Sequence, residues 1–299
     1  MFNLILIFIC LLIGIGFQKI KTLPKDTHVA LNVVILYVAL PSLTLLSIPT
    51  LKWDVSLLSL CLMPWIVFAG AYFIFTYLGA KSKWSQHVIG CLILCAGLGN
   101  TSFVGFPLIE AFMGKEALKY AVLVDQTGTF LICSTFGIWI ASQYSHGKIP
   151  KRELLKRVIV FPPFVSFAVA LIFVAIGYYP TGVTLNVLER FAAMLAPLAL
   201  ISVGLQVRLG EVRESVHYLK WGLGYKLIVA PIMIFILYSL FGMPVQIFKV
   251  AVLESAMAPM ITASIVAASY GLQPRLAGLM VGVGVPLSLL TLSVWYFFL

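Results

Sequence analysis

A run of nine residues at positions 99–107 reads Gly-Asn-Thr-Ser-Phe-Val-Gly-Phe-Pro and lies inside a long apolar segment. Proline cannot donate a backbone hydrogen bond, and its ring clashes with the preceding turn. We therefore expect the carbonyls of Phe103 and Val104 to lose their helical partners at Pro107. Inside a membrane, freed backbone groups must be satisfied by protein, water or a ligand. The run predicts an interrupted membrane helix of the kind that forms the midplane sites of transporters.

A second polar run with a proline lies in the C-terminal half and reads Glu-Ser-Ala-Met-Ala-Pro-Met-Ile-Thr at positions 254–262. Other residues recur between the halves at a separation of 156 positions, as in the pairs Pro41 and Pro197, Gly128 and Gly284, and Trp139 and Trp295. Two interrupted spans in corresponding positions of two halves are typical of transporters built from inverted repeats. We therefore predict an internal repeat.

The composition excludes an ordinary soluble domain. The chain is 62% hydrophobic and 10% charged, with a mean hydropathy of +1.07, whereas soluble domains carry about 25% charged residues. The net charge of +10 is spread over short gaps between apolar segments, so it does not indicate nucleic-acid binding. The five cysteines all lie in apolar segments without metal-ligand companions, which argues against disulfides and a metal site.

We expect an all-α polytopic membrane protein with ten spans, since a spanning helix needs about 20 mostly apolar residues. The predicted spans are 2–18, 30–49, 56–79, 87–113, 117–142, 158–178, 188–207, 219–241, 246–270 and 275–298. Residues 1–145 form the predicted first repeat of five spans, 146–157 a short basic cytoplasmic loop, and 158–299 the second repeat. An odd number of spans in each half inverts the second half relative to the first, with interrupted spans four and nine.

The basic residues predict the orientation. One set of alternate loops holds 14 lysines and arginines and the other set holds 5. The positive-inside rule assigns the richer set to the cytoplasm. Both termini are then extracytoplasmic, and we expect a multi-pass protein of the cell (inner or plasma) membrane.

Ionisable residues inside spans cost about 2.5–3.5 kcal/mol each on insertion scales, so each one suggests a function. Asp125 and Gln126 open a polar run in span five, and Glu254 lies five residues before Pro259. Lys226 in span eight is a candidate partner of Glu254 or of an anionic substrate; alternatively it reaches the cytoplasmic surface along its own stem. Glu110 reads as a residue at a helix end.

The uncharged candidates lie at the two interruptions. Asn100 can both donate and accept hydrogen bonds, so beside a broken helix it is a candidate substrate contact, with packing between helices as the alternative. Thr101, Pro107 and Pro259 complete the predicted substrate-binding set. Asp125, Gln126 and Glu254 are the predicted coupling residues. No metalloprotease, serine hydrolase or ATP-binding motif is present, so we do not expect an enzyme.

Several motifs together resemble the auxin efflux carrier family. They are the run at 99–107, Val-Asp-Gln-Thr-Gly at 124–128, Pro-Leu-Ala-Leu-Ile-Ser-Val-Gly-Leu at 197–205, Glu-Ser-Ala-Met-Ala-Pro at 254–259 and Gly-Leu-Gln-Pro-Arg-Leu-Ala-Gly at 271–278. Their order and spacing cover nearly the whole chain. The short loop at 146–157 makes the chain similar to compact prokaryotic members.

The resemblance implies a fold related to those of bile acid symporters and sodium/proton antiporters. It implies a scaffold from spans 1, 2, 6 and 7 and a transport domain from spans 3–5 and 8–10, with spans four and nine crossing at the site. Asn100 and Pro107 would lie on the first crossing helix, and Glu254 and Pro259 on the second. The resemblance is also compatible with a homodimer.

The predicted function is transport of a small organic anion, a carboxylate, by elevator-like alternating access in the lipid bilayer. No cofactor is expected, and coupling to H⁺ or Na⁺ stays open beside uniport. The alternative is a membrane receptor that binds a ligand without net transport.

Overall fold

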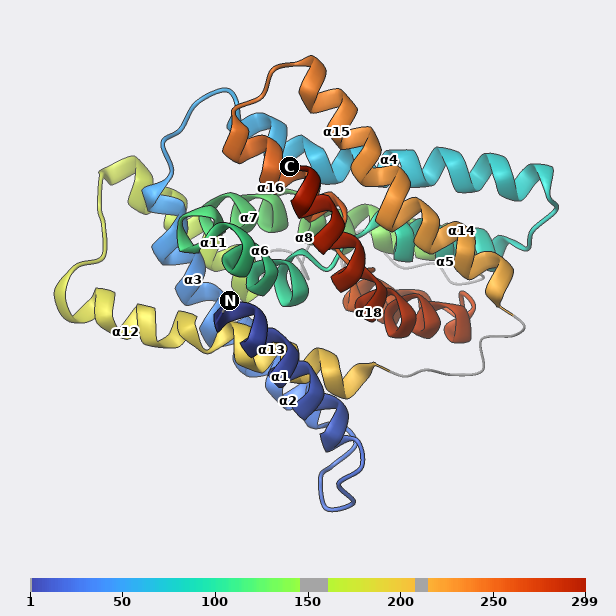
Figure 1. Cartoon of the computed structure of the whole chain (residues 1–299), viewed down its shortest axis with the longest axis horizontal. Helices are drawn as coiled ribbons and strands as arrows, with labels where there is room; N and C mark the ends of the chain where they lie inside the picture. Colours follow the sequence, from blue (N-terminus) through green and yellow to red (C-terminus); the bar gives the residue numbers. More distant parts are fainter. Residues whose placement is uncertain (1, 146–160, 208–214) are drawn as a thin grey trace. The chain divides into compact units, whose positions relative to one another are not determined.

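The computed structural model describes residues 2–145, 161–207 and 215–299 (Figure 1). The predicted basic loop at 146–157 lies outside the described residues. Within the described ranges the regular structure is helical throughout, with no strand and one isolated β-bridge. The prediction of an all-helical protein is confirmed.

In the part of the chain that the structure describes, six helices are long and apolar enough to cross a membrane: Thr27–Thr50, Leu57–Lys81, Lys115–Tyr144, Gly182–Gln206, Val216–Leu240 and Pro274–Phe298. Shorter apolar helices cover Ile5–Phe17, Gln86–Gly97, Thr101–Met113 and Pro162–Ile176. A helix rises 1.5 Å per residue, so these shorter elements fall short of the hydrocarbon thickness of about 30 Å. The chain is thus a multi-pass membrane protein.

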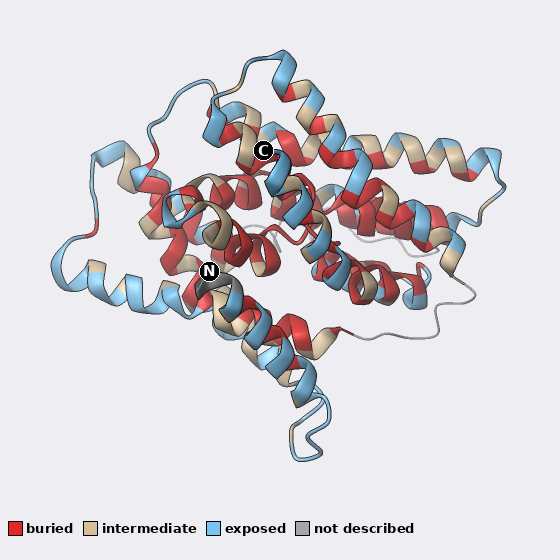
Figure 2. Cartoon of the chain, viewed as in Figure 1, coloured by how far each residue is buried: buried red, intermediate tan, exposed pale blue. Residues whose placement is uncertain are grey.

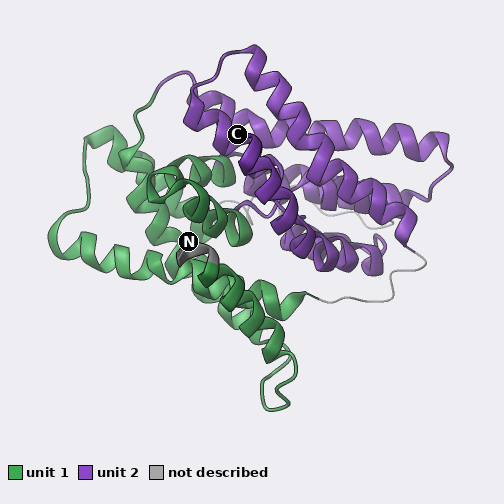
Figure 3. Ribbon diagram, viewed as in Figure 1, with its two compact units in different colours: residues 1–53, 102–126, 159–207 green, residues 54–101, 127–158, 208–299 purple. Residues whose placement is uncertain are grey.

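The chain divides into two compact units, which Figure 3 distinguishes by colour. Unit 1 comprises residues 1–53, 102–126 and 159–207. Its elements are α1 (Phe2–Phe17), α2 (Thr27–Val34), η1 (Ile35–Ala39), α3 (Leu40–Ser47), η2 (Ile48–Thr50), α6 (Phe106–Met113), η4 (Lys115–Ala117), α7 (Leu118–Val124), α11 (Pro162–Ile176), α12 (Gly182–Ala193) and α13 (Leu195–Gln206).

Unit 2 comprises residues 54–101, 127–158 and 208–299. Its elements are α4 (Leu57–Lys81), α5 (Gln86–Gly97), α8 (Phe130–Ile132), η6 (Cys133–Gly137), α9 (Ile138–Tyr144), α14 (Val216–Gly224), η7 (Tyr225–Val229), α15 (Ala230–Leu240), α16 (Val245–Ser255), α17 (Ile261–Ser269) and α18 (Pro274–Phe298). Two π-helices, η3 (Thr101–Gly105) and η5 (Asp125–Thr129), contain two of the points at which the chain passes from one unit to the other. Helix α5 is buried along most of its length, whereas α12 of unit 1 is largely exposed (Figure 2).

Three prolines within helices follow short π-helices by two residues. Pro41 follows η1, Pro107 follows η3 and Pro231 follows η7. A proline offers no N–H to the carbonyl four residues before it. A π-helical turn, in which a carbonyl accepts from the residue five positions later, precedes each of the three prolines, and the helix continues past the proline. The prediction that span four is interrupted at Pro107 is therefore wrong in position: the helix continues through Pro107.

The interruption lies earlier, at Leu98 to Asn100. Helix α5 ends at Gly97, Leu98 is extended, and helical structure resumes at Thr101. The second interruption lies between Ser255 and Ile261, as the sequence predicts around Pro259. Both spans thus break where the chain has small or polar residues.

Unit 1 is held together by a close crossing of α1 and α13. A Cβ atom placed on Gly14 would lie 2.8 Å from the Cα of Gly204, so this crossing requires glycine. The Gln18 side chain donates two hydrogen bonds across the same pair of helices, to the Gly204 carbonyl at 2.7 Å and the Val207 carbonyl at 2.9 Å. These carbonyls lie at the C-terminal end of α13, where the helix leaves acceptors without partners of its own.

We expect Gly14→Ala to destabilise unit 1, because its added methyl group must push two backbones apart. Overpacking of this kind costs about 1–3 kcal/mol. The matched control is Gly16→Ala, since a Cβ atom at Gly16 meets nothing within 4 Å. Thermal unfolding in detergent should show a lower midpoint for Gly14→Ala and an unchanged or higher one for Gly16→Ala. Equal midpoints would contradict the close crossing.

Candidate functional site

The two interrupted spans meet within unit 2. The extended residues around Gly99 and Pro259 run antiparallel and form the isolated β-bridge. The Asn100 amide donates to the Ala258 carbonyl at 2.7 Å, and the Met260 amide donates to the Leu98 carbonyl at 3.0 Å. We call residues 98–100 and 256–260 together the crossing.

At the crossing, backbone groups that the interruptions leave without helical partners are partly paired with each other. All of its residues are buried, and Ala256, Met257 and Ala258 are fully buried. An unpaired backbone group in such surroundings costs free energy comparable to a lost hydrogen bond. Backbone groups left unpaired by one break form hydrogen bonds with backbone groups of the other break. Each break is therefore stabilised by the other.

Lys226, on η7, lies next to the crossing, with 1% of its surface exposed. Its ammonium group donates to the carbonyl of Ser255 at 2.9 Å. Ser255 is the last residue of α16, where the helix dipole presents a partial negative charge. Lys226 therefore caps the end of this half-helix, and the alternative that it reaches the membrane surface is wrong.

The carboxylate of Glu254 adds a second interaction. It attracts the charge of Lys226 electrostatically, and 1% of its surface is exposed. Gly99 lies close to this lysine: a Cβ atom there would lie 2.9 Å from the Lys226 Nζ, so a larger residue would require the end of the lysine side chain to shift. The buried Lys226 thus lies at the C-terminal end of α16 and interacts electrostatically with an acidic side chain.

A tryptophan fixes the helix that carries Lys226. Pro231 has no N–H for the carbonyl of Leu227, and the indole Nε1 of Trp295 on α18 donates to that carbonyl at 3.1 Å. On the other side, the Tyr225 hydroxyl donates to the Val67 carbonyl on α4 at 2.5 Å. Lys226 is therefore held on a short π-helix tied to two neighbouring helices.

The remaining predicted residues of unit 2 lie around the same crossing. Asn100 and Thr101 are 2% exposed and follow directly on Gly99. Pro259 packs against α18, where a Cβ atom on Gly284 would lie 2.6 Å from the proline Cδ. The structure thus gathers Asn100, Pro259, Lys226 and Glu254 in one region.

The other predicted residues belong to unit 1. Asp125 and Gln126 are buried in η5, and the Gln126 amide donates to Asp125 Oδ2 at 3.0 Å. Pro107 lies in the first turn of α6. The structure does not bring these three residues into the unit that holds the crossing.

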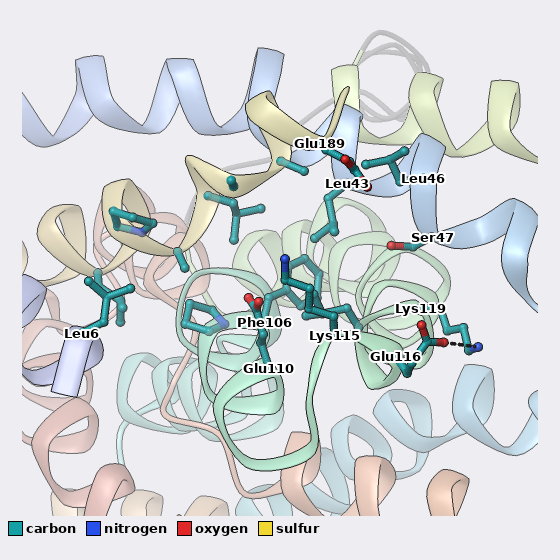
Figure 4. Close-up of a pocket in the computed structure, with 18 of the residues that line it drawn as sticks. Leu6, Leu43, Leu46, Ser47, Phe106, Glu110, Lys115, Glu116, Lys119 and Glu189 are labelled. Atoms are coloured by element: carbon teal, nitrogen blue, oxygen red, sulfur yellow. Dashed lines mark hydrogen bonds and ion pairs between the residues drawn. The ribbon is translucent and has the colours of Figure 1, made fainter. Parts of the chain in front are cut away.

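Pro107 lines a cavity of about 600 Å³ in unit 1 (Figure 4). The charged residues that line it are Glu110, Lys115, Glu116, Lys119 and Glu189. Lys119 and Glu116 form an ion pair at 3.1 Å, drawn as the dashed line in Figure 4. The apolar walls come from α1, α3, α6, α7, α12 and α13.

The sequence did not identify this cavity. The sequence predicts Glu110 to lie at a helix end and gives no functional role to Lys115, Glu116, Lys119 or Glu189. Each lies at or near the end of an apolar segment, where charged residues are ordinary. The available signal was the concentration of charge between residues 110 and 119, which alone does not reveal that Glu189 of α12 faces the same space.

The profile of the family described as "Membrane transport protein" matches residues 1–296 of the chain. The chain belongs to this family, the auxin efflux carriers. Membership confirms the resemblance drawn from the sequence motifs, and it makes the protein a membrane transport protein rather than an enzyme.

Two archaeal relatives are similar to this membrane transport protein along nearly their whole length. An uncharacterized transporter of Methanocaldococcus jannaschii is 27% identical over 302 residues, covering 97% of this chain and 96% of the relative. An uncharacterized transporter of Methanothermobacter thermautotrophicus is 29% identical over 294 residues, covering 97% and 95%. The transporter shares their compact size.

We expect Lys226→Met to destabilise this transporter strongly, because it leaves the Glu254 carboxylate buried beside the negative end of α16. Removing one partner of a buried charge pair costs about 3–5 kcal/mol. Adding Glu254→Gln should recover part of that loss. A double-mutant cycle of thermal unfolding in detergent measures the coupling.

The matched control is the exposed ion pair of Lys119 and Glu116, in which 89% of the glutamate side chain is accessible. A double-mutant cycle with Lys119→Met and Glu116→Gln should give a coupling energy of at most about 1 kcal/mol. A coupling energy between Lys226 and Glu254 no larger than that of the control pair would show that the two buried residues do not stabilise each other.

Proposed function

We propose that the protein is a secondary transporter of a small organic anion, a carboxylate, which binds at the crossing. The observation that carries the proposal is a buried ammonium group, Lys226, held at an interruption shared by two membrane spans. Burying a cation inside a membrane protein is costly, so a buried lysine suggests either a function or a full set of partners. Interrupted spans near the midplane are the usual place for substrate in secondary transporters.

The crossing offers donors suited to a carboxylate. Helix α17 begins at Ile261 directly after the extended residues, and the first N–H groups of a helix have no partner within it. The positive end of the helix dipole favours an anion there. In this proposal the Asn100 side chain donates a further hydrogen bond, Lys226 supplies the charge, and Thr101 and Pro259 border the substrate.

The cavity of unit 1 is less suited to hold the anion by itself. Its lining has three carboxylates and two ammonium groups, one of which is paired with Glu116. This excess of negative charge disfavours a carboxylate at equilibrium. In this proposal the cavity, with Pro107 on its wall, does not bind the substrate tightly by itself.

Coupling in this proposal belongs to the buried acidic residues. Glu254 at the crossing, and Asp125 with Gln126 in η5, are the groups that would bind H⁺ or Na⁺ during one half of the cycle. Carboxyl groups buried in membrane proteins commonly form proton and ion pathways. No cofactor enters the proposed cycle.

The proposed architecture has ten spans in two inverted repeats. The six long helices, the shorter α1 and α11, and the two interrupted spans supply that number within the described residues. The proposed scaffold, from spans 1, 2, 6 and 7, has its helices in unit 1, and most of the proposed transport domain has its helices in unit 2. Residues 102–126, which the proposal assigns to the transport domain, belong to unit 1 by contact.

The proposed cycle is an elevator-like movement of the transport domain in the cell membrane, with both termini extracytoplasmic. A homodimer built through the scaffold is compatible with this cycle. The alternative function, a receptor that binds its ligand without moving it, predicts binding without flux.

Counterflow of labelled small carboxylates into liposomes tests the proposal, with and without proton or sodium gradients. We expect Asn100→Ala to lower the apparent affinity about tenfold, because a lost hydrogen bond to a charged group costs about 1.5–3 kcal/mol. We expect Glu254→Gln to keep counterflow but lose its dependence on the gradient. The control is Asn186→Ala, on the exposed face of α12.

If Asn100→Ala and Glu254→Gln both transported like the wild type, the crossing would not be the substrate site. Saturable binding of a carboxylate without counterflow would favour the receptor. Uptake by Asn186→Ala should equal that of the wild type in either case.

A further inference from the structure

An open groove lies on the surface of unit 2, away from the crossing residues. Its volume is about 510 Å³, and its walls come from α4, α14 and η7. The apolar part of the lining is formed by Ile74, Phe75, Gly224, Tyr225, Ile228 and Val229. Because no side chain projects from Gly224, the floor stays open: a Cβ atom there would meet nothing within 4 Å.

The surface around the groove is apolar and exposed. Phe73 and Tyr77 on α4 are 69% and 67% exposed, and Ile228 at the groove itself is 52% exposed. Exposed apolar side chains on helices of membrane-spanning length face lipid tails. The groove therefore opens toward the hydrocarbon rather than toward water.

One end of the groove is basic. His217 and Lys220, in the first turns of α14, complete its lining together with Trp221. Neither His217 nor Lys220 forms a hydrogen bond or an ion pair with another described residue; His217 makes only ring contacts, among them one with Trp84 at 5.9 Å. Tryptophan and tyrosine gather at the level of lipid headgroups, and Tyr218 packs on the same Trp84 ring.

From this combination we infer that the groove binds an anionic phospholipid, with an acyl chain along the apolar walls and the headgroup phosphate at Lys220 and His217. The charge is complementary, since the polar end carries ammonium and imidazole groups, and among the described residues no acidic side chain lines the groove. Basic pockets between spans on the cytoplasmic side are typical sites for anionic headgroups. The basic loops at this end of α4 and α14 are those assigned to the cytoplasm.

The groove also contacts the part of the molecule that carries Lys226. Tyr225, Ile228 and Val229 line the groove, and Lys226 and Leu227 of the same π-helix face the crossing and α18. A lipid in the groove therefore packs against the element that positions the buried ammonium group.

Native mass spectrometry of the full chain, released from nanodiscs of mixed phosphatidylglycerol and phosphatidylcholine, tests the inference. The wild type should retain phosphatidylglycerol in preference to phosphatidylcholine. Gly224→Leu should abolish retention by filling the groove, whereas Gly278→Leu, at another helical position where a Cβ atom meets nothing within 4 Å, should not. Lys220→Gln should lower the preference for phosphatidylglycerol about fivefold, the effect of one basic residue at a membrane surface. Lys25→Gln, an exposed lysine of the same basic side, should leave the preference unchanged.

A second arm separates a lipid from a soluble phosphate. Glycerol phosphate, which has the headgroup chemistry without acyl chains, should not displace the retained lipid at millimolar concentration. Displacement by glycerol phosphate, or equal retention in wild type and Gly224→Leu, would overturn the inference. So would a lipid preference that Lys220→Gln and Lys25→Gln change alike.

Discussion

The backbone hydrogen bonds that join residues 98–100 to 258–260 are the interaction on which the rest of unit 2 depends. Extended backbone buried among apolar helices has no water to bond with, and each break alone would leave several polar groups without partners. Pairing the two breaks removes part of this cost, and Lys226 removes more by capping the end of α16. The buried charge is in turn tolerated because a helix end and an acidic side chain surround it.

The sequence predicted the class of protein and an interruption in each of two spans, the first of them misplaced at Pro107, and it singled out most of the charged residues near the crossing. Inserting Lys226 or Glu254 into a membrane is costly, so their presence inside apolar segments singles them out as candidates without any structure. The partner of Lys226 was not predictable in the same way, since it is the backbone carbonyl of Ser255 and every residue has such a carbonyl.

Proline was the misleading signal. The prediction of an interruption at Pro107 depends on its missing N–H, but the helices continue through Pro41, Pro107 and Pro231, each of which follows a π-helical turn. The actual interruption falls at Leu98 to Asn100, which contains no proline. The cavity and the groove escaped prediction for another reason: each gathers residues from segments far apart in the sequence, such as Glu110 with Glu189 and Phe75 with Lys220.

The mutual pairing of the interruptions also limits how the protein can move. Separating Asn100 from Ala258, or Met260 from Leu98, would expose amide and carbonyl groups to surroundings that cannot solvate them. The two breaks therefore cannot act as independent hinges. Any rearrangement that carries cargo past this point must carry residues 98–100 and 256–260 together as a single rigid piece, with the flexing displaced to parts of the helices further along the chain.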